Sequence, residues 1–401
     1  MSKKTRRVAG AVLAASAAFA MVAPSAFAAV DDAPPIQIDG AVIYSTDGPY
    51  VGRIADTDRV ATAIKALCSR SDWGSELILA DSNNYADALA SAPLADLLDA
   101  PILVTPGAPN GNGDALDPRI VSLLVLGCDG KKASGDEGKF RSVAITSGTG
   151  VLTDKIAKQL AADPVWKADG TLDTSKGAGL SYVERYSGAN RFQTSAAIAS
   201  EVRWLIEEDG GDNLDVFFAD GYNFPDALAA GAAAAQHNGV VLLTMGATGV
   251  DQSTFEVASN GPWAGGDMAH RQIWAVGGNA AKAMKPGWQG QPIEATNVVV
   301  GADRYETAAM LAKQVFGTGA DAPVDYVVAS GEIYADAVFA GGYAANLDAP
   351  LLLTASASLS PATAEYLKSV APAKSRVIVF GGNGSVTPTV QGQLVTALTK
   401  V

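Results

Sequence analysis

The sequence predicts three tandem α/β modules, each built on a parallel sheet with helices on both faces. Two observations lead to this fold class. Four short phrases recur in the same order three times along the 401 residues, which indicates three homologous modules. Within each copy, short apolar runs alternate with helix-like segments, and strand–helix–strand alternation favours right-handed crossovers into a parallel sheet.

The four phrases are defined by shared residues. An arginine phrase, Arg-x-x-Thr, begins at Arg59, Arg191 and Arg304. An aspartate phrase, aromatic-x-Asp-Ala, contains Asp87, Asp226 and Asp336. An apolar run then ends at Thr105, Thr244 and Thr354, in each copy 18 residues after the aspartate. The last phrase is an apolar run that ends in glycine, at residues 143–148, 272–278 and 376–382.

Each phrase predicts one or two elements. The helix after the arginine phrase has expected N-caps at Asp58, Asn190 and Asp303, with Gln193 and Glu306 at the capping-box position. A short strand follows (77–80, 216–219, 326–329), and the aspartate phrase leads into an Ala-rich helix such as 335–346. The next strand is wholly apolar, as in parallel sheets covered on both faces. A helix, the glycine-ended strand and a final helix, 388–398 in the third copy, complete a Rossmann- or flavodoxin-like module.

Residues 1–28 have the pattern of a secretory signal peptide. Lys3, Lys4, Arg6 and Arg7 precede an apolar stretch, and Ala26-Phe27-Ala28 resembles a cleavage site. Cleavage there would make the chain four units more negative than its net charge of −13. So acidic a chain is a poor candidate for nucleic-acid binding. No later apolar run is long enough to span a membrane.

Copy borders and cysteines differ between the repeats. We place the modules at 35–176, 177–292 and 293–401, and the first carries a polar insertion near 129–139 that is typical of a surface loop.

Cys68 and Cys128 both lie in the first module. In an exported protein they form either a disulfide or two buried thiols, and the sequence leaves both open.

The repeated polar residues have two interpretations each. Asp87, Asp226 and Asp336 are expected in the first turn of a helix, where a carboxylate is stabilised by free amides; this cap is the favoured interpretation. Alternatively, these aspartates, with Asn83, Asn223 and their counterparts, line a crevice at the strand ends and accept hydrogen bonds from sugar hydroxyls. The repeated arginines, Arg59, Arg191 and Arg304, either pair with those aspartates inside a module, which we favour, or face outward to bind carboxylate or phosphate.

Catalytic signatures are weak. The glycine turns do not complete the dinucleotide pattern G-x-G-x-x-G. The two histidines, His237 and His270, are both in the second copy and are not repeated, so no His-rich metal centre is expected. Nothing catalytic repeats with the modules, and we predict no enzyme activity, no cofactor and no metal.

The ordered phrases resemble the cell-wall-binding repeat 2 family over nearly the whole chain after residue 35. The resemblance implies three Rossmann-like modules in a pseudo-threefold arrangement that bind an anionic secondary polymer of the Gram-positive cell wall non-covalently. It also implies an anchoring motif, which corresponds to Ile102-Leu103-Val104, Val241-Leu242-Leu243 and Leu351-Leu352-Leu353. Because these residues are expected in buried strands, we interpret the motif as necessary for module integrity.

The sequence therefore predicts a secreted, S-layer-like wall-binding protein whose partner is a wall polysaccharide. The net negative charge has to be overcome locally, by arginine clusters at module junctions or by bridging cations. The alternative is an exported hydrolase or small-ligand-binding protein that uses one asymmetric crevice near His237 or His270. Symmetry separates the two hypotheses, because a wall binder should present similar polar residues in all three modules.

Overall fold

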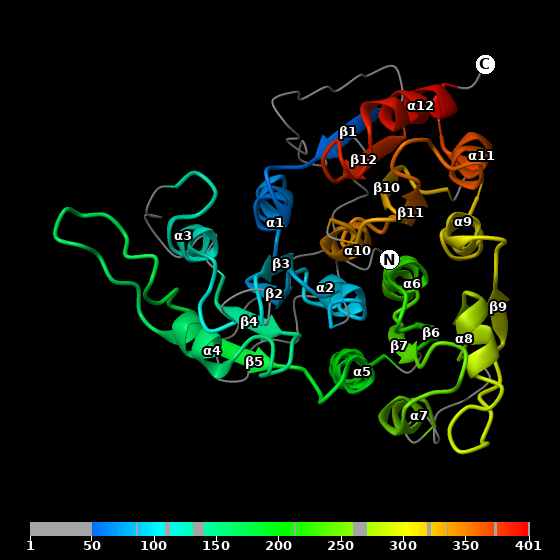
Figure 1. Ribbon diagram of the computed structural model, residues 1–401, viewed down its shortest axis with the longest axis horizontal. Coiled ribbons are helices and arrows are strands. Elements are labelled where there is room, and N and C mark those ends of the chain that lie inside the picture. Colours follow the sequence, from blue (N-terminus) through cyan, green and yellow to red (C-terminus); the bar gives the residue numbers. More distant parts are fainter. Residues whose placement is uncertain are drawn as a thin grey trace, which may run out of the picture.

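The structure, a computed structural model, describes residues 50–85, 87–108, 113–130, 140–211, 214–259, 271–318, 322–334, 336–372 and 375–399. The predicted leader and most of the predicted insertion near 129–139 lie outside the described residues. Three parallel four-stranded sheets with interspersed helices confirm the predicted fold class (Figure 1). No described helix is both long and apolar enough to cross a bilayer.

The three sheets share one strand order. The first contains, side by side, β3 (Ile102–Thr105), β2 (Glu76–Asp81), β4 (Ser142–Ile145) and β5 (Tyr182–Arg185). The second contains β7 (Val240–Thr244), β6 (Val216–Asp220), β8 (Ile273–Val276) and β9 (Asn297–Val299). The third contains β11 (Leu351–Thr354), β10 (Asp325–Ser330), β12 (Arg376–Phe380) and β1 (Tyr50–Ile54).

The fourth strand of each sheet comes from the next repeat. β5 precedes the second arginine phrase but pairs with β4 of the first sheet, and β9 likewise pairs with β8. β1, at the start of the first repeat, pairs with β12 of the third sheet, with Ile54 opposite Phe380. The helices after these strands, α1 (Arg59–Cys68), α5 (Arg191–Glu208) and α9 (Arg304–Val315), contact β3, β7 and β11 of their own repeat. Each repeat is therefore tied to its predecessor, and the third to the first.

Three inner helices meet at the centre of this ring (Figure 1). They are α2 (Ala92–Leu97), α6 (Phe224–Gln236) and α10 (Ala337–Ala345), and each contacts the other two. Ala92, Ala235 and Ala345, one from each, form a small buried cluster. A Cβ on Gly231 would lie 2.9 Å from that of Ala92, so small residues are needed where the helices approach.

The remaining helices cover the outer faces. They are α3 (Pro118–Leu126), α4 (Asp154–Ala161), α7 (Gln252–Ser259), α8 (Gly278–Ala283), α11 (Pro361–Val370) and α12 (Pro388–Leu398). Cys68 at the end of α1 and Cys128 just after α3 form a disulfide with a Cα–Cα distance of 5.6 Å. The bridge therefore joins two helices of the first repeat, and it has no counterpart in the other two.

The residues of the anchoring motif are buried in β3, β7 and β11, each at most 5% exposed. Some of them also face a neighbouring repeat. A Cβ on Gly342 of α10, in the third repeat, would lie 2.5 Å from Cδ1 of Ile102 in the first. β11 in turn contacts α6 of the second repeat. The motif thus fills the core of each sheet and part of the contact between repeats.

Candidate functional site

The carboxyl ends of the strands form three junctions between repeats, named 1/2, 2/3 and 3/1 after the repeats that meet there. Each junction brings together an aspartate phrase from one repeat, the glycine-ended turn of the same repeat and the arginine phrase of the next. The predicted N-caps hold the arginine phrase in place. Asn190 Oδ1 accepts hydrogen bonds from the amides of Phe192 and Gln193, and Asp303 Oδ1 does so from Tyr305 and Glu306.

The threonine of each arginine phrase fixes the loop that precedes it. Thr194 Oγ1 accepts a hydrogen bond from the amide of Gly188 at 3.1 Å, and Thr307 Oγ1 accepts one from Gly301 at 3.1 Å. In the first repeat Thr62 bonds the amide of Asp56 at 3.0 Å. The loop between edge strand and helix therefore has a defined shape at all three junctions.

The repeated arginines bond backbone carbonyls. Arg191 Nη1 donates to the carbonyl of Gly221 at 2.7 Å, and Arg59 and Arg304 donate to the equivalent carbonyls of Ser82 and Gly331. These carbonyls follow the second strand of the arginine's own repeat. The guanidinium thus ties its helix to the strand-end loop.

The carboxylate that faces each arginine belongs to the preceding repeat. Arg191 attracts Asp87, Arg304 attracts Asp226, and Arg59 attracts Asp336. Burial raises the pKa of each aspartate, and the charge of the arginine opposes that rise. The predicted ion pair inside one module is therefore wrong. The arginine and aspartate phrases meet only because the ring places successive repeats side by side.

The aspartates are mostly buried, and they are not equivalent helix caps. Asp226 lies in the first turn of α6 as predicted, and Asp336 is the N-cap residue of α10 but makes no capping hydrogen bond with its side chain. Asp87 precedes α2 by five residues, so a first-turn position is wrong there. Instead the carboxylates reach the glycine-ended turns: a Cβ on Gly277 would lie 1.9 Å from Asp226 Oδ2, and one on Gly381 would lie 2.7 Å from Asp336 Oδ2.

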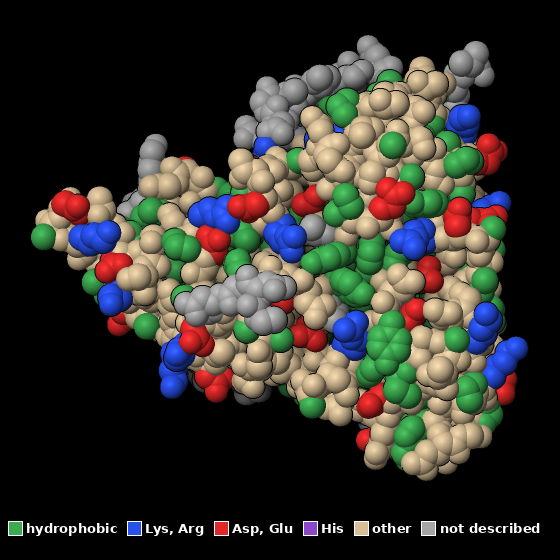
Figure 2. Space-filling model, in the orientation of Figure 1, with side chains coloured by type: hydrophobic (Ala, Val, Ile, Leu, Met, Phe, Trp, Pro, Cys, Tyr) green, Lys and Arg blue, Asp and Glu red, His purple; other side chains and the backbone are tan. Residues whose placement is uncertain are grey.

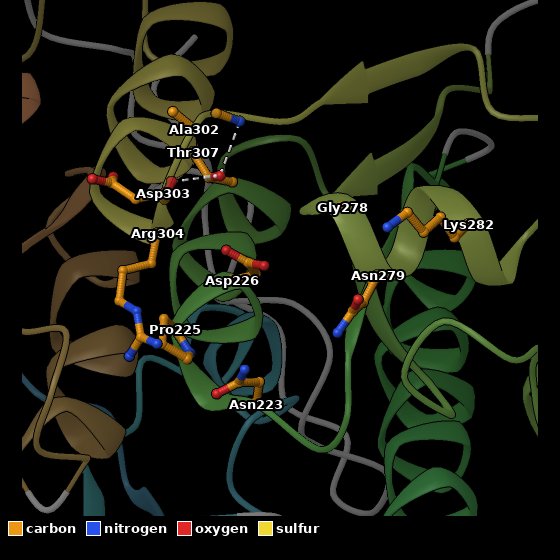
Figure 3. Close-up of a pocket in the computed structure, with 11 residues that line it drawn as sticks. Asn223, Pro225, Asp226, Gly278, Asn279, Lys282, Ala302, Asp303, Arg304 and Thr307 are labelled. Atoms are coloured by element: carbon orange, nitrogen blue, oxygen red, sulfur yellow. Dashed lines mark hydrogen bonds between the residues drawn. The ribbon is translucent and has the colours of Figure 1, made fainter.

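A pocket of about 250 Å³ lies at junction 2/3 (Figure 3). Asp226 and Arg304 border it on one side, and Asn279 and Lys282 of α8 border it on the other. Asn223, from the loop before α6, completes this set of polar side chains. Amides, two cations and a carboxylate can hydrogen-bond hydroxyls and hold an anionic group, which suits an acidic sugar.

Asp226 is the most perturbed carboxyl of the three. Burial and the neighbouring charge of Asp220 raise its pKa to about 6, although Arg304 counteracts the shift. Burial also raises the pKa of Asp87 and that of Asp336. The carboxylate of Asp336 accepts a hydrogen bond from Ser385 Oγ at 2.9 Å. The three junctions therefore have the same arrangement of residues, but the surroundings of their carboxyl groups differ.

Several residues at the junctions were missed by sequence reasoning. Asp81 and Asp220 end the second strand, and each carboxylate accepts the amide two residues later at 2.9 Å. Arg53 on β1 and Arg185 on β5 donate to the carbonyls of Gly381 and Ser147. These residues could have been found from the sequence, because Asp81 and Asp220, like Arg53 and Arg185, hold equivalent positions in two repeats. Asn84 would also have been a better match than Asn83, because it is three residues before Asp87 as Asn223 is before Asp226, whereas Asn83 aligns with Tyr222.

The histidine expected in an asymmetric crevice lies elsewhere. His237 follows α6, and its Nδ1 is 2.8 Å from Oδ2 of Asp215, which precedes β6. This pair is at the amino end of the strand, opposite the pocket, beside the rings of Phe217 and Trp274. His270 lies outside the described residues. In the part of the chain that the structure describes, no cluster of His, Cys, Asp and Glu is suited to hold a metal ion.

The chain resembles a known bacterial protein over about half of its length. Over 213 residues the chain is 27% identical to the N-acetylmuramoyl-L-alanine amidase LytC of Bacillus subtilis (strain 168), an alignment that covers 53% of this chain and 38% of that protein. The chain therefore matches well under half of this relative.

Two solved structures share the fold. Cwp8 from Clostridium difficile has a TM-score of 0.64 at 21% identity and covers 88% of this chain and 52% of that one. Cwp6 from the same organism has a TM-score of 0.65 at 22% identity and covers 88% and 48%.

Three segments, 53–157, 185–283 and 299–391, match Cell wall binding domain 2 (CWB2). They coincide with the three repeats, and each begins within an edge strand, β1, β5 or β9. The resemblance inferred from the repeated phrases is confirmed: the chain belongs to the Cell wall binding domain 2 family.

Proposed function

We propose that the protein is exported and binds the bacterial cell wall non-covalently, through an anionic secondary wall polymer held at the junctions between repeats. The observation that supports this most is the pocket at junction 2/3, where Arg304 and Lys282 face amide and carboxylate groups. A polymer with charged groups and hydroxyls finds both kinds of partner there.

Basic side chains in the pocket offset the repulsion expected between an acidic chain and an anionic polymer. Lys282 is exposed and Arg304 is half-buried, and both line the same pocket. At acidic pH Asp226 takes up a proton, because burial raises its pKa to about 6. The pocket then carries one negative charge fewer, and polymer binding should strengthen below pH 6.

We also propose that the chain acts by binding and not by catalysis. The amidase that it resembles is matched over 38% of its length, and the CWB2 segments account for the three repeats. Of the two histidines that an asymmetric crevice could use, His237 is paired with Asp215 at the far end of the second sheet.

Co-sedimentation with purified Gram-positive walls tests the proposal. The chain from residue 29 should sediment with intact walls and stay in solution with walls stripped of secondary polymer. Lys282→Glu should weaken sedimentation at low salt, whereas Lys285→Glu, an exposed lysine three residues further on that does not line the pocket, should leave it unchanged. Failure of the wild-type chain to sediment at any salt or calcium concentration would contradict the proposal.

A further inference from the structure

Tyr222 is an exposed aromatic side chain held in a fixed position. Its side chain is 56% exposed, yet its amide donates to Asp220 Oδ1 at 2.9 Å. The ring of Phe192 meets its ring edge-on, with centroids 5.5 Å apart. The guanidinium of Arg191 lies 5.7 Å from its centroid. The ring is therefore pre-oriented without being covered, which lowers the entropy lost when a ligand stacks on it.

The surroundings of Tyr222 are aromatic and basic. Tyr85 of the first repeat donates its hydroxyl to the carbonyl of Tyr222 at 2.9 Å, and Arg191 lies 6.0 Å from the ring of Tyr85. Tyr85 in turn contacts Phe224 and Tyr334, with centroids 5.6 and 5.1 Å away. On this face, apolar side chains gather where the inner helices meet, and basic side chains surround them (Figure 2).

Tyr222 is specific to the second repeat. Its counterparts are Asn83 in the first and Glu332 in the third. Hydrogen bonds from Ser356 lower the pKa of Glu332, and the charge of Arg304 adds a smaller contribution. Near Arg304 a carboxylate thus occupies the place that an aromatic ring occupies near Arg191. Asn223, next to Tyr222, lines the pocket at junction 2/3, so one short loop connects that pocket with the aromatic surface at junction 1/2.

We propose that Tyr222 is a stacking platform for a sugar ring of an acidic glycan, with Arg191 beside it to attract the acid group. The C–H groups on one face of a pyranose are slightly positive and match the negative face of an aromatic ring. A guanidinium next to such a ring pairs with a carboxylate or phosphate on the same or the adjoining sugar. The proposal rests on the wall-binding function and names the residue that distinguishes the second repeat in it.

The proposal is tested by titration calorimetry with a uronic-acid glycan purified from Gram-positive walls, and with the same glycan after reduction of its carboxyl groups. Tyr222→Ala should weaken binding of the acidic glycan about tenfold, and Tyr222→Phe should bind like the wild type. The matched control is Tyr182→Ala on β5, where a 68% exposed tyrosine lies at the amino end of its strand. The reduced glycan should bind the wild type more weakly and still lose affinity in Tyr222→Ala.

The outcomes separate this proposal from the general function. Wild-type binding with an unchanged Tyr222→Ala affinity, at an unchanged melting temperature, would overturn the role of Tyr222 and leave wall binding intact. An equal loss in Tyr182→Ala would overturn it as well, since it would indicate a general effect of removing an exposed ring. If the wild type bound neither the glycan nor intact walls, both proposals would fall.

Discussion

Junctions 2/3 and 3/1 are made from equivalent residues but are closed differently. At junction 2/3 the polypeptide runs from α8 directly into β9, so the second sheet receives its edge strand from the next stretch of chain. At junction 3/1 the edge strand is β1, from the other end of the chain. No peptide link joins these two repeats, which are held by the pairing of β1 with β12 and by side-chain contacts such as the hydrogen bond from Arg53 to the carbonyl of Gly381. The third sheet therefore depends on a long-range contact that the other two do not need.

The largest expected effect comes from breaking that contact. Ile54 in β1 and Val299 in β9 hold equivalent positions, and both are 0% exposed. Ile54→Asp buries an unpaired charge and should lower the free energy of unfolding on the order of 5 kcal/mol. Only this variant should also enlarge the radius of gyration, because no peptide link holds junction 3/1. Small-angle scattering checks this, and an equal expansion in Val299→Asp would contradict the comparison.

A smaller loss is expected from removing the disulfide of the first repeat. Cys68 and Cys128 are 60 residues apart, and a loop of that length predicts about 4 kcal/mol of stabilisation through the unfolded state. Chemical denaturation of Cys68→Ser/Cys128→Ser measures the change, and the reduced wild type is the control. A midpoint equal to that of the oxidised wild type would show that the ring alone holds α1 and α3 in place.

Asp226→Asn should act in the opposite direction. The folded-state pKa of Asp226, about 6, is above its ordinary value of 3.8, so the folded protein is penalised when this group is ionised at pH 7. At 1.36 kcal/mol per pKa unit, Asn should stabilise by up to about 3 kcal/mol at pH 7. The gain should fade as the pH drops from 6 to 4, where the wild-type carboxyl is protonated when folded.

Thermal melts of Asp226→Asn and the wild type at pH 7, 5.5 and 4 measure the difference. Asp336→Asn is the matched variant at junction 3/1, where the carboxylate keeps a hydrogen bond from Ser385 and the gain should be smaller. A pH-independent difference between Asp226→Asn and the wild type would refute the assignment of a raised pKa.

The smallest effects should follow from the arginines. Arg304→Ala removes the bond to the Gly331 carbonyl and the attraction to Asp226, at a cost of about 1 to 2 kcal/mol. Arg59→Ala should cost slightly more, because its guanidinium also lies 5.6 Å from the ring centroid of Tyr334. Urea denaturation compares the two. A fully stable Arg304→Ala protein that no longer sediments with walls would show that this arginine serves the polymer alone and is no structural tie.

The sequence predicted the elements that are buried and repeated. β2, β3 and β4 and their counterparts are apolar at almost every position, and the N-caps Asp58, Asn190 and Asp303 precede helices where expected. The edge strands were missed because they lack this pattern: Tyr182 is 68% exposed and Val298 is 57% exposed. A strand with one open edge and few buried side chains leaves little trace in hydrophobic periodicity.

The candidate site was predictable only in its residue types. Spacing identified Arg191 and Asp87 as repeated residues, but their contact crosses from one repeat to another. The partner of each arginine depends on which sheet receives the edge strand, and that is decided by tertiary packing. The carbonyl of Gly221, which Arg191 bonds, belongs to the backbone and has no signature in the sequence.

Because each sheet takes its edge strand from another repeat, the polypeptide could begin at any of the three repeats without changing the ring. α12 contacts β1 just as α4 contacts β5, so a circular permutant opened before β5 and joined from α12 to β1 would keep every strand neighbour. Copy number is fixed by the same geometry. A fourth repeat would separate β1 from β12, and two repeats would leave the inner helices without their third partner. The pairing of β1 with β12 and the mutual contacts of the inner helices therefore fit a ring of three repeats.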